Sequence, residues 1–174
     1  VKVQRSIMTT YRADITSYAG KMSLLVKRVF DSMPSALGKQ DKRFILSDIE
    51  KGASLRKYED PTQWLIDAGI AYYSFNTKAF ELPFEATENR RLYKLYMVDT
   101  GLLCSQLLKK MQFRVLNGEI DVNEGALTEN FVACALAAKD VALHYYDKKS
   151  KLELDFVIPD ENGITIIEVK SGTE

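Results

Sequence analysis

The end of the chain places two carboxylates and a lysine where they could act on a phosphate ester. Glu168-Val169-Lys170 follows an apolar run at 164–167, and an earlier apolar run at 153–158 contains Asp155. Successive side chains of a β-strand point to opposite faces, so Glu168 and Lys170 share one face. If the two runs form neighbouring strands, Asp155 meets Glu168 and Lys170. Such a group suits a divalent metal ion and a phosphodiester.

Each of these residues has a definable role in that chemistry. Asp155 and Glu168 would hold Mg²⁺ through oxygen ligands, which this ion prefers. The metal would polarise the phosphate and lower the pKa of an attacking water, and Lys170 would position that water or offset developing charge. Asp155, Glu168 and Lys170 are therefore candidate catalytic residues. Glu129, on a strongly apolar predicted helix, joins Asp155 and Glu168 as a candidate metal ligand.

Structural roles compete with these assignments. A semi-buried Glu129 could form a salt bridge or a backbone hydrogen bond that ties its helix to the sheet. Aspartate is a poor strand former, so Asp155 could lie at an edge or pair with Lys170. Glu168 and Lys170 could form the charged face of an exposed strand end. The residue types leave both kinds of role open.

The order of these residues resembles the PD-(D/E)XK nuclease superfamily. In that superfamily an acidic residue ends one strand, Glu-X-Lys lies on the next strand, and a Glu often lies on the preceding helix. The matching residues here are Asp155, Glu168 with Lys170, and Glu129. The resemblance implies Mg²⁺-dependent cleavage of DNA. Because members of the superfamily often keep the fold and a partial site without cleavage, it leaves open whether the chain is an enzyme.

A longer resemblance covers most of the chain. It is to a C-terminal domain of unknown function that follows the ATPase module of many prokaryotic AAA-type ATPases. The similar segments are 11–15, 91–103, 125–132, 144–146, 153–158 and 167–172. The resemblance implies that an ATPase module precedes Val1. The chain contains no GxxxxGK[ST] phosphate loop, so we expect no nucleotide-binding residues and no ATP hydrolysis in it, and ATP only in the missing module.

The first hundred residues have the element order of a winged helix. Apolar residues at helical spacing predict a helix over 18–33 that ends before Pro34. A short strand, a one-turn helix, a helix interrupted at Pro61 and two strands follow. Helix, short strand, two helices and hairpin is the winged-helix order. These later elements are predicted at 43–46, 47–52, 54–68, 71–75 and 92–98.

The remaining residues predict an α/β unit. We expect helices at 102–113 and 125–139, a turn at Asn117-Gly118 and a strand at 141–146, before the two strands that carry the acidic residues. The fold class is therefore α/β (α+β).

Three segments follow from these elements and from the resemblance. Residues 1–18 would connect to the missing ATPase module, 19–101 would form the winged-helix domain, and 102–174 would form a truncated restriction-endonuclease-like α/β domain. The chain lacks an initial Met and ends just after a predicted strand, so we expect a fragment.

The predicted recognition helix of the winged helix carries the candidate DNA-binding residues. Lys51, Arg56, Lys57 and Gln63 lie in or before it and could reach phosphates or base edges. Acidic residues lie close by in the sequence, so a solvated face is the alternative. The chain has 24 Lys or Arg and 24 Asp or Glu. This balance argues against a broad electrostatic grip on nucleic acid, so double-stranded DNA would need a local basic patch.

Composition argues against several other classes of protein. Hydrophobic residues make up 46% of the chain, which is enough to build a core. Cys104 and Cys134 are expected to be free core thiols in a reducing cytoplasm, and one histidine argues against a structural zinc site. No apolar run approaches the roughly 20 residues of a membrane span, and no signal peptide is visible. We expect a cytoplasmic protein without a membrane partner.

Three functions fit these features. The first is a regulatory module that binds DNA or a protein partner, acts on the missing ATPase and has no ATPase activity itself. The second is an Mg²⁺-dependent PD-(D/E)XK-type nuclease acting on DNA, and the third is a platform for protein assembly. Cleavage in Mg²⁺ separates the second from the others, and salt-dependent DNA binding separates the first from the third. The sequence does not predict an oligomeric state.

Overall fold

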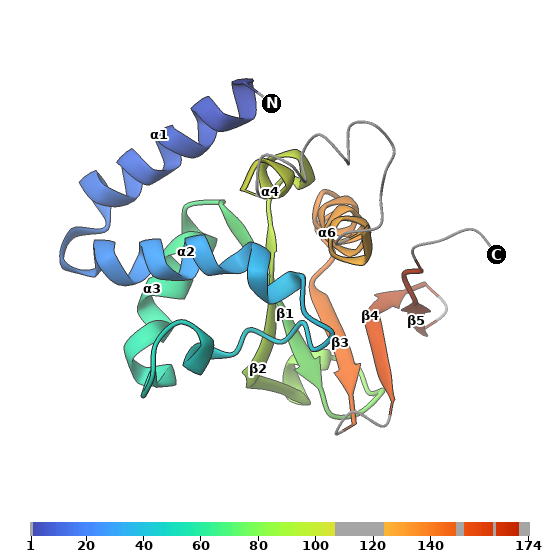
Figure 1. Ribbon diagram of the computed structural model, residues 1–174. Coiled ribbons are helices and arrows are strands. Elements are labelled where there is room, and N and C mark those ends of the chain that lie inside the picture. The colour runs from blue at the N-terminus through green and yellow to red at the C-terminus, as the bar shows by residue number, and fades with distance from the viewer. Residues whose placement is uncertain (1, 107–123, 149–151, 162, 171–174) are drawn as a thin grey trace.

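A five-stranded mixed sheet forms the frame of the protein (Figure 1). The computed structural model describes residues 2–106, 124–148, 152–161 and 163–170. The strand order is β2-β1-β3-β4-β5. The strands are β1 (Ala71–Thr77), β2 (Glu88–Met97), β3 (Leu143–Asp147), β4 (Glu153–Asp160) and β5 (Gly163–Ile167). Together with the helices, this sheet confirms the predicted α/β class.

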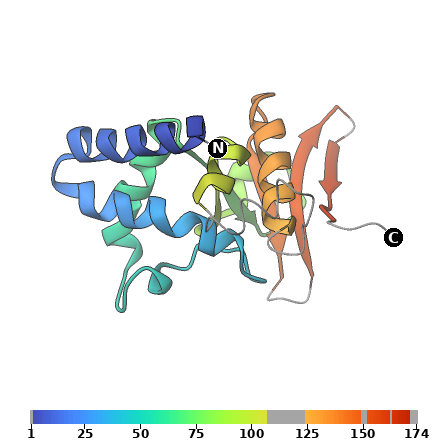
Figure 2. The ribbon, with the colours of Figure 1, turned by 45° about the horizontal axis from the view of Figure 1, so that its top comes forward.

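The helices cover the sheet unevenly. They are α1 (Lys2–Tyr18), α2 (Ser23–Leu37), α3 (Leu55–Asp67), α4 (Thr100–Gln106) and α6 (Glu124–Ala137). Within the described residues, 3-10 turns lie at Gly20–Met22, Leu46–Asp48 and Phe84–Ala86. Helix α2 contacts β2, α3 contacts β1, and α6 contacts both β2 and β3. Figure 2 shows α6 lying along the sheet, with α1, α2 and α3 gathered beside the β1–β2 hairpin.

Helix α2 follows the predicted apolar spacing but extends past the predicted end. Its buried residues are Val26, Val29, Phe30, Met33 and Leu37. The expected exit at Pro34 is wrong, because α2 continues through this residue to Leu37. A proline in the last turn removes only its own N–H, and the Pro34 carbonyl still accepts the Gly38 N–H at 3.1 Å. Pro61 likewise lies inside α3; of the two outcomes expected there, a kink or two short helices, the second is wrong, because α3 is one helix.

The short strand predicted at 43–46 is absent. This segment is irregular and leads into the 3-10 turn at Leu46–Asp48. The Phe44 N–H donates to the Tyr93 carbonyl of β2 at 2.8 Å, so one hydrogen bond forms where the prediction placed a strand pair. A single hydrogen bond does not make this segment a β-strand. The winged-helix domain stays a prediction.

The sheet joins the two halves of the chain. Strands β1 and β2 form an antiparallel hairpin, and β1 also pairs in parallel with β3, so Ser74 lies opposite Leu143. Strands β3, β4 and β5 continue the sheet with antiparallel pairs. The predicted division of the chain at 101/102 therefore falls between strands of one sheet, and the division itself stays a prediction.

Some predicted elements differ in length or fall outside the described residues. Helix α4 covers the start of the helix predicted at 102–113, and the rest of that helix and the turn at Asn117-Gly118 lie outside the described residues. Strand β5 ends at Ile167. Among the described helices, none has the length and apolar character that crossing a membrane requires.

Candidate functional site

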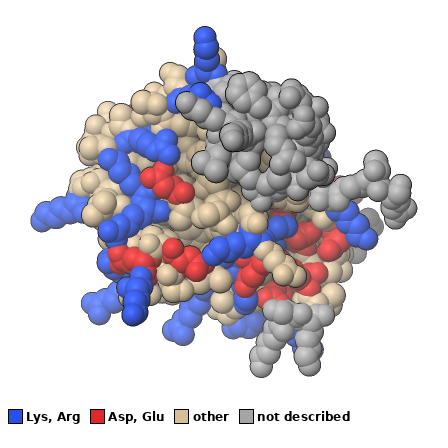
Figure 3. Space-filling view, viewed as in Figure 1, with Lys and Arg blue, Asp and Glu red and all other residues tan. Residues whose placement is uncertain are grey.

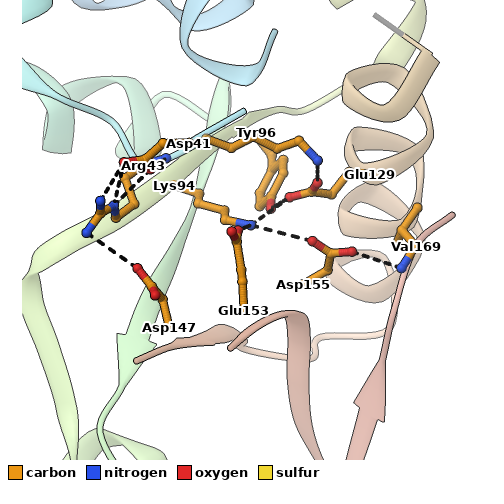
Figure 4. Close-up of polar contacts among 10 residues, drawn as sticks. Asp41, Arg43, Lys94, Tyr96, Glu129, Asp147, Glu153, Asp155 and Val169 are labelled. Carbon is orange, nitrogen blue, oxygen red and sulfur yellow. Dashed lines mark hydrogen bonds and ion pairs between the residues drawn. The ribbon is translucent and has the colours of Figure 1, made fainter. Parts of the chain in front are cut away.

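A buried lysine lies at the centre of a group of carboxylates. Lys94 of β2 is 0% exposed, and its Nζ lies 3.0 Å from Glu129 Oε1, 2.9 Å from Glu153 Oε1 and 3.7 Å from Asp155 Oδ1 (Figure 4). These carboxylates come from α6 and β4. The Lys94 cluster, as we call it, comprises Lys42, Lys94, Tyr96, Glu129, Glu153 and Asp155. Residues from four separate parts of the chain thus meet beside one face of the sheet.

Glu129 uses both carboxylate oxygens within this cluster. Its side chain is fully buried; Oε1 accepts the Tyr96 hydroxyl at 2.5 Å as well as Lys94, and Oε2 contacts the Lys42 ammonium. Burial opposes the charge of Glu129, but Lys94 and Lys42 outweigh it and hold its pKa below the ordinary value. Glu129 is therefore an ionised anchor that ties α6 to β2 and to the segment after α2. This matches the salt-bridge role that the sequence left open.

The same contacts keep Lys94 charged. Burial would lower the pKa of Lys94, but Glu129 and Glu153 raise it above the ordinary value. The Nζ also lies 5.1 Å from the centre of the Tyr145 ring. Burial, and then Glu129, raises the pKa of Tyr96 well above its ordinary value, so its hydroxyl stays protonated as a donor. Lys94 is thus an ammonium group and not a free base or nucleophile.

A β-bulge directs Asp155 toward this cluster. The register of β3 and β4 shifts between His144 and Tyr146, so β4 has one extra residue at this point. As a result, consecutive residues both contact β2: Asp155 lies near Lys94, and the Phe156 ring lies 5.6 Å from the Tyr96 ring. Without the shift, alternation would send one of the two side chains to the opposite face.

Glu168 and Lys170 flank Val169, whose backbone contacts Asp155, but neither side chain forms an ion pair with the Lys94 cluster in the described residues. The prediction placed both on a strand, but β5 ends at Ile167, and the Val169 N–H donates to Asp155 Oδ2 at 2.9 Å. A side chain thus takes the N–H that a continued strand would give to its neighbour. Both residues are exposed and form no ion pair with the described residues. The structure therefore brings Glu129 and Asp155 together around Lys94, while the catalytic and metal roles of the four residues stay predictions.

The donor set does not fit Mg²⁺ as it is arranged. The described residues contain no group of three or more His, Cys, Asp or Glu side chains placed to hold a metal ion. Both oxygens of Glu129 already face ammonium or hydroxyl groups, and Lys94 Nζ takes the central position among the carboxylates. A hard divalent ion needs oxygen ligands without competing cations. No catalytic step through a metal follows from this geometry.

Replacement of Asp155 by alanine tests its structural role. We expect the free energy of unfolding to fall by about 1–3 kcal/mol, because the Val169 N–H loses its acceptor and Lys94 loses a nearby carboxylate. Urea unfolding measures the change, and the exposed Glu161→Ala in the same hairpin is the matched control. An unchanged stability for Asp155→Ala would instead support a residue kept for metal binding.

Sequence reasoning missed Lys42, Lys94, Tyr96 and Asn130. Lys94 had a readable signal, because a lysine inside the apolar strand Leu92–Val98 needs a charged partner if the strand is buried. The Asn130 side chain pairs with both backbone groups of Met97, accepting the N–H at 2.8 Å and donating to the carbonyl at 3.1 Å. No local pattern pointed to that contact.

The candidate DNA-binding residues are exposed but only partly available. Lys57 pairs with Glu50, and Gln63 Nε2 donates to Asp67 Oδ1 at 2.8 Å. Lys51 and Arg56 form no ion pair with the described residues. The exposed side of α3 also carries acidic residues, Glu59, Asp60 and Asp67. Helix α3 is therefore a mixed surface and not a basic one.

Comparison with known families divides the chain into two matched regions. A family model described as a domain of unknown function, DUF8612, matches residues 1–112, which is more than half of the chain. The chain belongs to the DUF8612 family. A second model, the domain of unknown function DUF4143, matches residues 124–174. No curated protein and no solved structure matches the chain.

The Lys94 cluster spans both matched regions. Lys42, Lys94 and Tyr96 lie in the DUF8612 region, and Glu129, Glu153 and Asp155 lie in the DUF4143 region. The parallel pair of β1 and β3 joins the same two regions. The two regions of this chain that match separate family models therefore share one sheet and one buried ionic network.

Proposed function

We propose that this chain is a binding and regulatory module of an AAA-type ATPase, which engages a partner through its DUF8612 region and transmits the effect to its DUF4143 region. The DUF4143 family is commonly found in proteins associated with AAA-type ATPases, which supports the setting. The observation that carries the proposal is the network of Lys42, Lys94 and Glu129, because it gives the two regions a shared buried contact.

Within the network of Lys42, Lys94 and Glu129, Lys42 is the residue closest to the surface. It lies between α2 and the 3-10 turn at Leu46–Asp48, and its side chain is 21% exposed, whereas Glu129 is fully buried. A partner that shifts this segment changes the charge environment of Glu129, and Glu129 lies on α6. In the low-dielectric interior, the contacts of the buried Glu129 carboxylate are strong, and losing one of them destabilises the protein. The network therefore couples a surface segment to a core helix.

The distribution of charge favours an acidic partner. Residues 1–57 contain twelve Lys or Arg and five Asp or Glu, although the whole chain is neutral. In Figure 3, Lys and Arg are spread over the side of this face that α1 and α2 form, while Asp and Glu lie mostly in a band across its middle and toward the other side. A partner that carries negative charge would be steered to the N-terminal third of the chain.

Two alternatives have less support from the geometry. Double-stranded DNA would need a basic recognition surface, but α3 mixes acidic residues with its basic ones, and Lys57 and Gln63 already have partners within the chain. An Mg²⁺-dependent nuclease would need Glu129 to present an oxygen to the metal ion, but both of its oxygens already contact ammonium or hydroxyl groups. Both alternatives, and the assembly platform, stay predictions.

Hydrogen exchange of Lys42→Met tests the proposed coupling. A hydrogen bond to a charged group contributes about 1.5–3 kcal/mol, so removing the Lys42 ammonium should speed exchange in α6 about tenfold or more. Mass spectrometry of peptides covering 124–137 measures this. Lys39→Met is the matched control, since Lys39 pairs with the exposed Asp48 at 2.5 Å. If α6 exchanges at the same rate in both variants, the regulatory proposal fails.

A further inference from the structure

A groove lies between α3 and the outer edge of the sheet, separate from the Lys94 cluster. Its volume is about 760 Å³. It is bounded by the segment before and within the 3-10 turn at Leu46–Asp48, by the first turn of α3 and by β2, which is the end strand of the sheet. An edge strand presents main-chain groups to an incoming chain. In β2, however, the Tyr93 carbonyl already accepts the Phe44 N–H at 2.8 Å, so the groove offers side chains rather than a free strand edge.

Arginines from three elements line this groove. They are Arg43 of the segment after α2, Arg56 of α3 and Arg91 of β2, with Glu59 as the one acidic lining residue. Arg43 is committed to Asp41, whose Oδ1 accepts from its Nε at 2.8 Å. Arg56 and Arg91 are exposed and form no ion pair with the described residues. Two guanidinium groups on opposite sides of the groove are thus available to carboxylates.

The floor of the groove is mostly apolar. Its lining includes Phe44, Leu46, Leu55, Leu92 and Tyr93. The Phe44 and Tyr93 rings stack with centroids 5.9 Å apart, which fixes part of this floor. Ile45, also in the lining, is 37% exposed. Apolar side chains beneath paired arginines suit a ligand that carries both an apolar anchor and negative charge.

We infer that this groove binds an extended acidic segment of a partner protein, with an apolar side chain on the Ile45 and Leu92 floor and carboxylates on Arg56 and Arg91. Arginine presents a planar pair of donors that matches a carboxylate. The inference rests on the proposed function and gives it a partner class and a docking surface.

A protein segment fits the groove better than nucleic acid does. Single-stranded nucleic acid needs a continuous basic track with exposed aromatic faces for stacking bases. Here Tyr93 is 3% exposed and Phe44 is 7% exposed, so neither ring offers a face to a base. The positive charge of the groove is confined to a few arginines around an apolar floor. This arrangement matches an acidic peptide with a central apolar residue.

Fluorescence anisotropy of a labelled decapeptide of alternating Glu and Leu tests the inference on the 174-residue chain. We expect saturable binding that weakens about tenfold or more in Arg56→Glu with Arg91→Glu, because each lost pair is a charge-assisted hydrogen bond. Lys21→Glu with Lys139→Glu makes the same change in net charge away from the groove lining and should weaken binding less than about twofold. The same peptide with Gln in place of Glu should bind about tenfold more weakly. Ile45→Asp should weaken binding without touching an arginine.

Several results would overturn the inference. They are an absence of peptide binding, an equal loss in the two double variants, or displacement of the peptide by a DNA duplex whose own binding also depends on Arg56 and Arg91. The last result would make the groove a nucleic-acid site. None of these results affects the outcome of the hydrogen-exchange experiment on Lys42→Met. The peptide-binding inference and the proposed coupling can therefore fail independently, and the two failures are distinguishable.

Discussion

Replacing Lys94 with Met is expected to lower the free energy of unfolding by about 3–5 kcal/mol, the cost of breaking a buried ion pair by removing one partner. The variant keeps the apolar stem of the side chain but leaves Glu129 with only Lys42 and Tyr96, and it leaves Glu153 without its buried cation. Guanidinium unfolding followed by circular dichroism measures the change. We expect it to be the largest effect of any single substitution in the sheet.

A double-mutant cycle separates the lost pair from lost packing. Lys94→Met combined with Glu129→Gln should be less destabilised than the sum of the two single variants, because neither charge then remains buried without its partner. Lys139→Met is the control for removing a lysine. Lys139 is exposed and lies just after the end of α6, so its replacement should leave stability unchanged. Additive losses in the cycle would contradict the coupling of Lys94 and Glu129.

Asn130→Ala is expected to cost about 1–3 kcal/mol, because it leaves the buried Met97 N–H without its acceptor and leaves the Met97 carbonyl with only the Cys134 thiol as a side-chain donor. The Asn130 amide makes the two contacts that a neighbouring strand would make, so it closes the end of β2. Thermal unfolding and urea unfolding should agree on the loss. Exchange of the Met97 amide hydrogen should also become faster.

Two further variants make this result specific to the amide. Asn130→Asp keeps an acceptor for the Met97 N–H but loses the donor to the carbonyl, so its stability should lie below that of the native protein. Phe131→Ala removes a large side chain from the next position of α6, but Phe131 is 64% exposed, so its loss should be much smaller. Equal losses for Asn130→Ala and Phe131→Ala would show that α6, and not the amide, is the sensitive feature.

The spacing of apolar residues and the runs of β-branched and aromatic residues predicted most elements, because each of these patterns favours one type of secondary structure. The helical spacing of α2 gave its buried face, and the β-branched and aromatic runs gave β1, β2 and β4. The errors arose where a tertiary contact decided the outcome. Pro34 was taken as a helix end although its position in the last turn costs little, and the segment at 43–46 has strand-like residues but only one bond to β2.

The Lys94 cluster was harder to predict because it depends on register. The sequence identified Glu129 and Asp155 as acids that needed partners, but the partner came from β2, which β1 and β3 separate from β4 in the sheet. That position depends on the parallel pair of β1 and β3 and on the bulge in β4, neither of which has a local signature. Lys170, which the residue pattern offered as one possible partner for Asp155, forms no ion pair with it in the described residues.

The parallel pair of β1 and β3 also bears on how the protein is made. Ser74 must wait for Leu143, which leaves the ribosome about seventy residues later, or several seconds at roughly 5–20 residues per second. During that interval the β1–β2 hairpin has an open inner edge that can pair with other nascent chains. Lys94 meanwhile has no Glu129 to pair with, so its ammonium group must stay hydrated. The speed of translation between the two regions thus sets how long an incomplete sheet is exposed to aggregation.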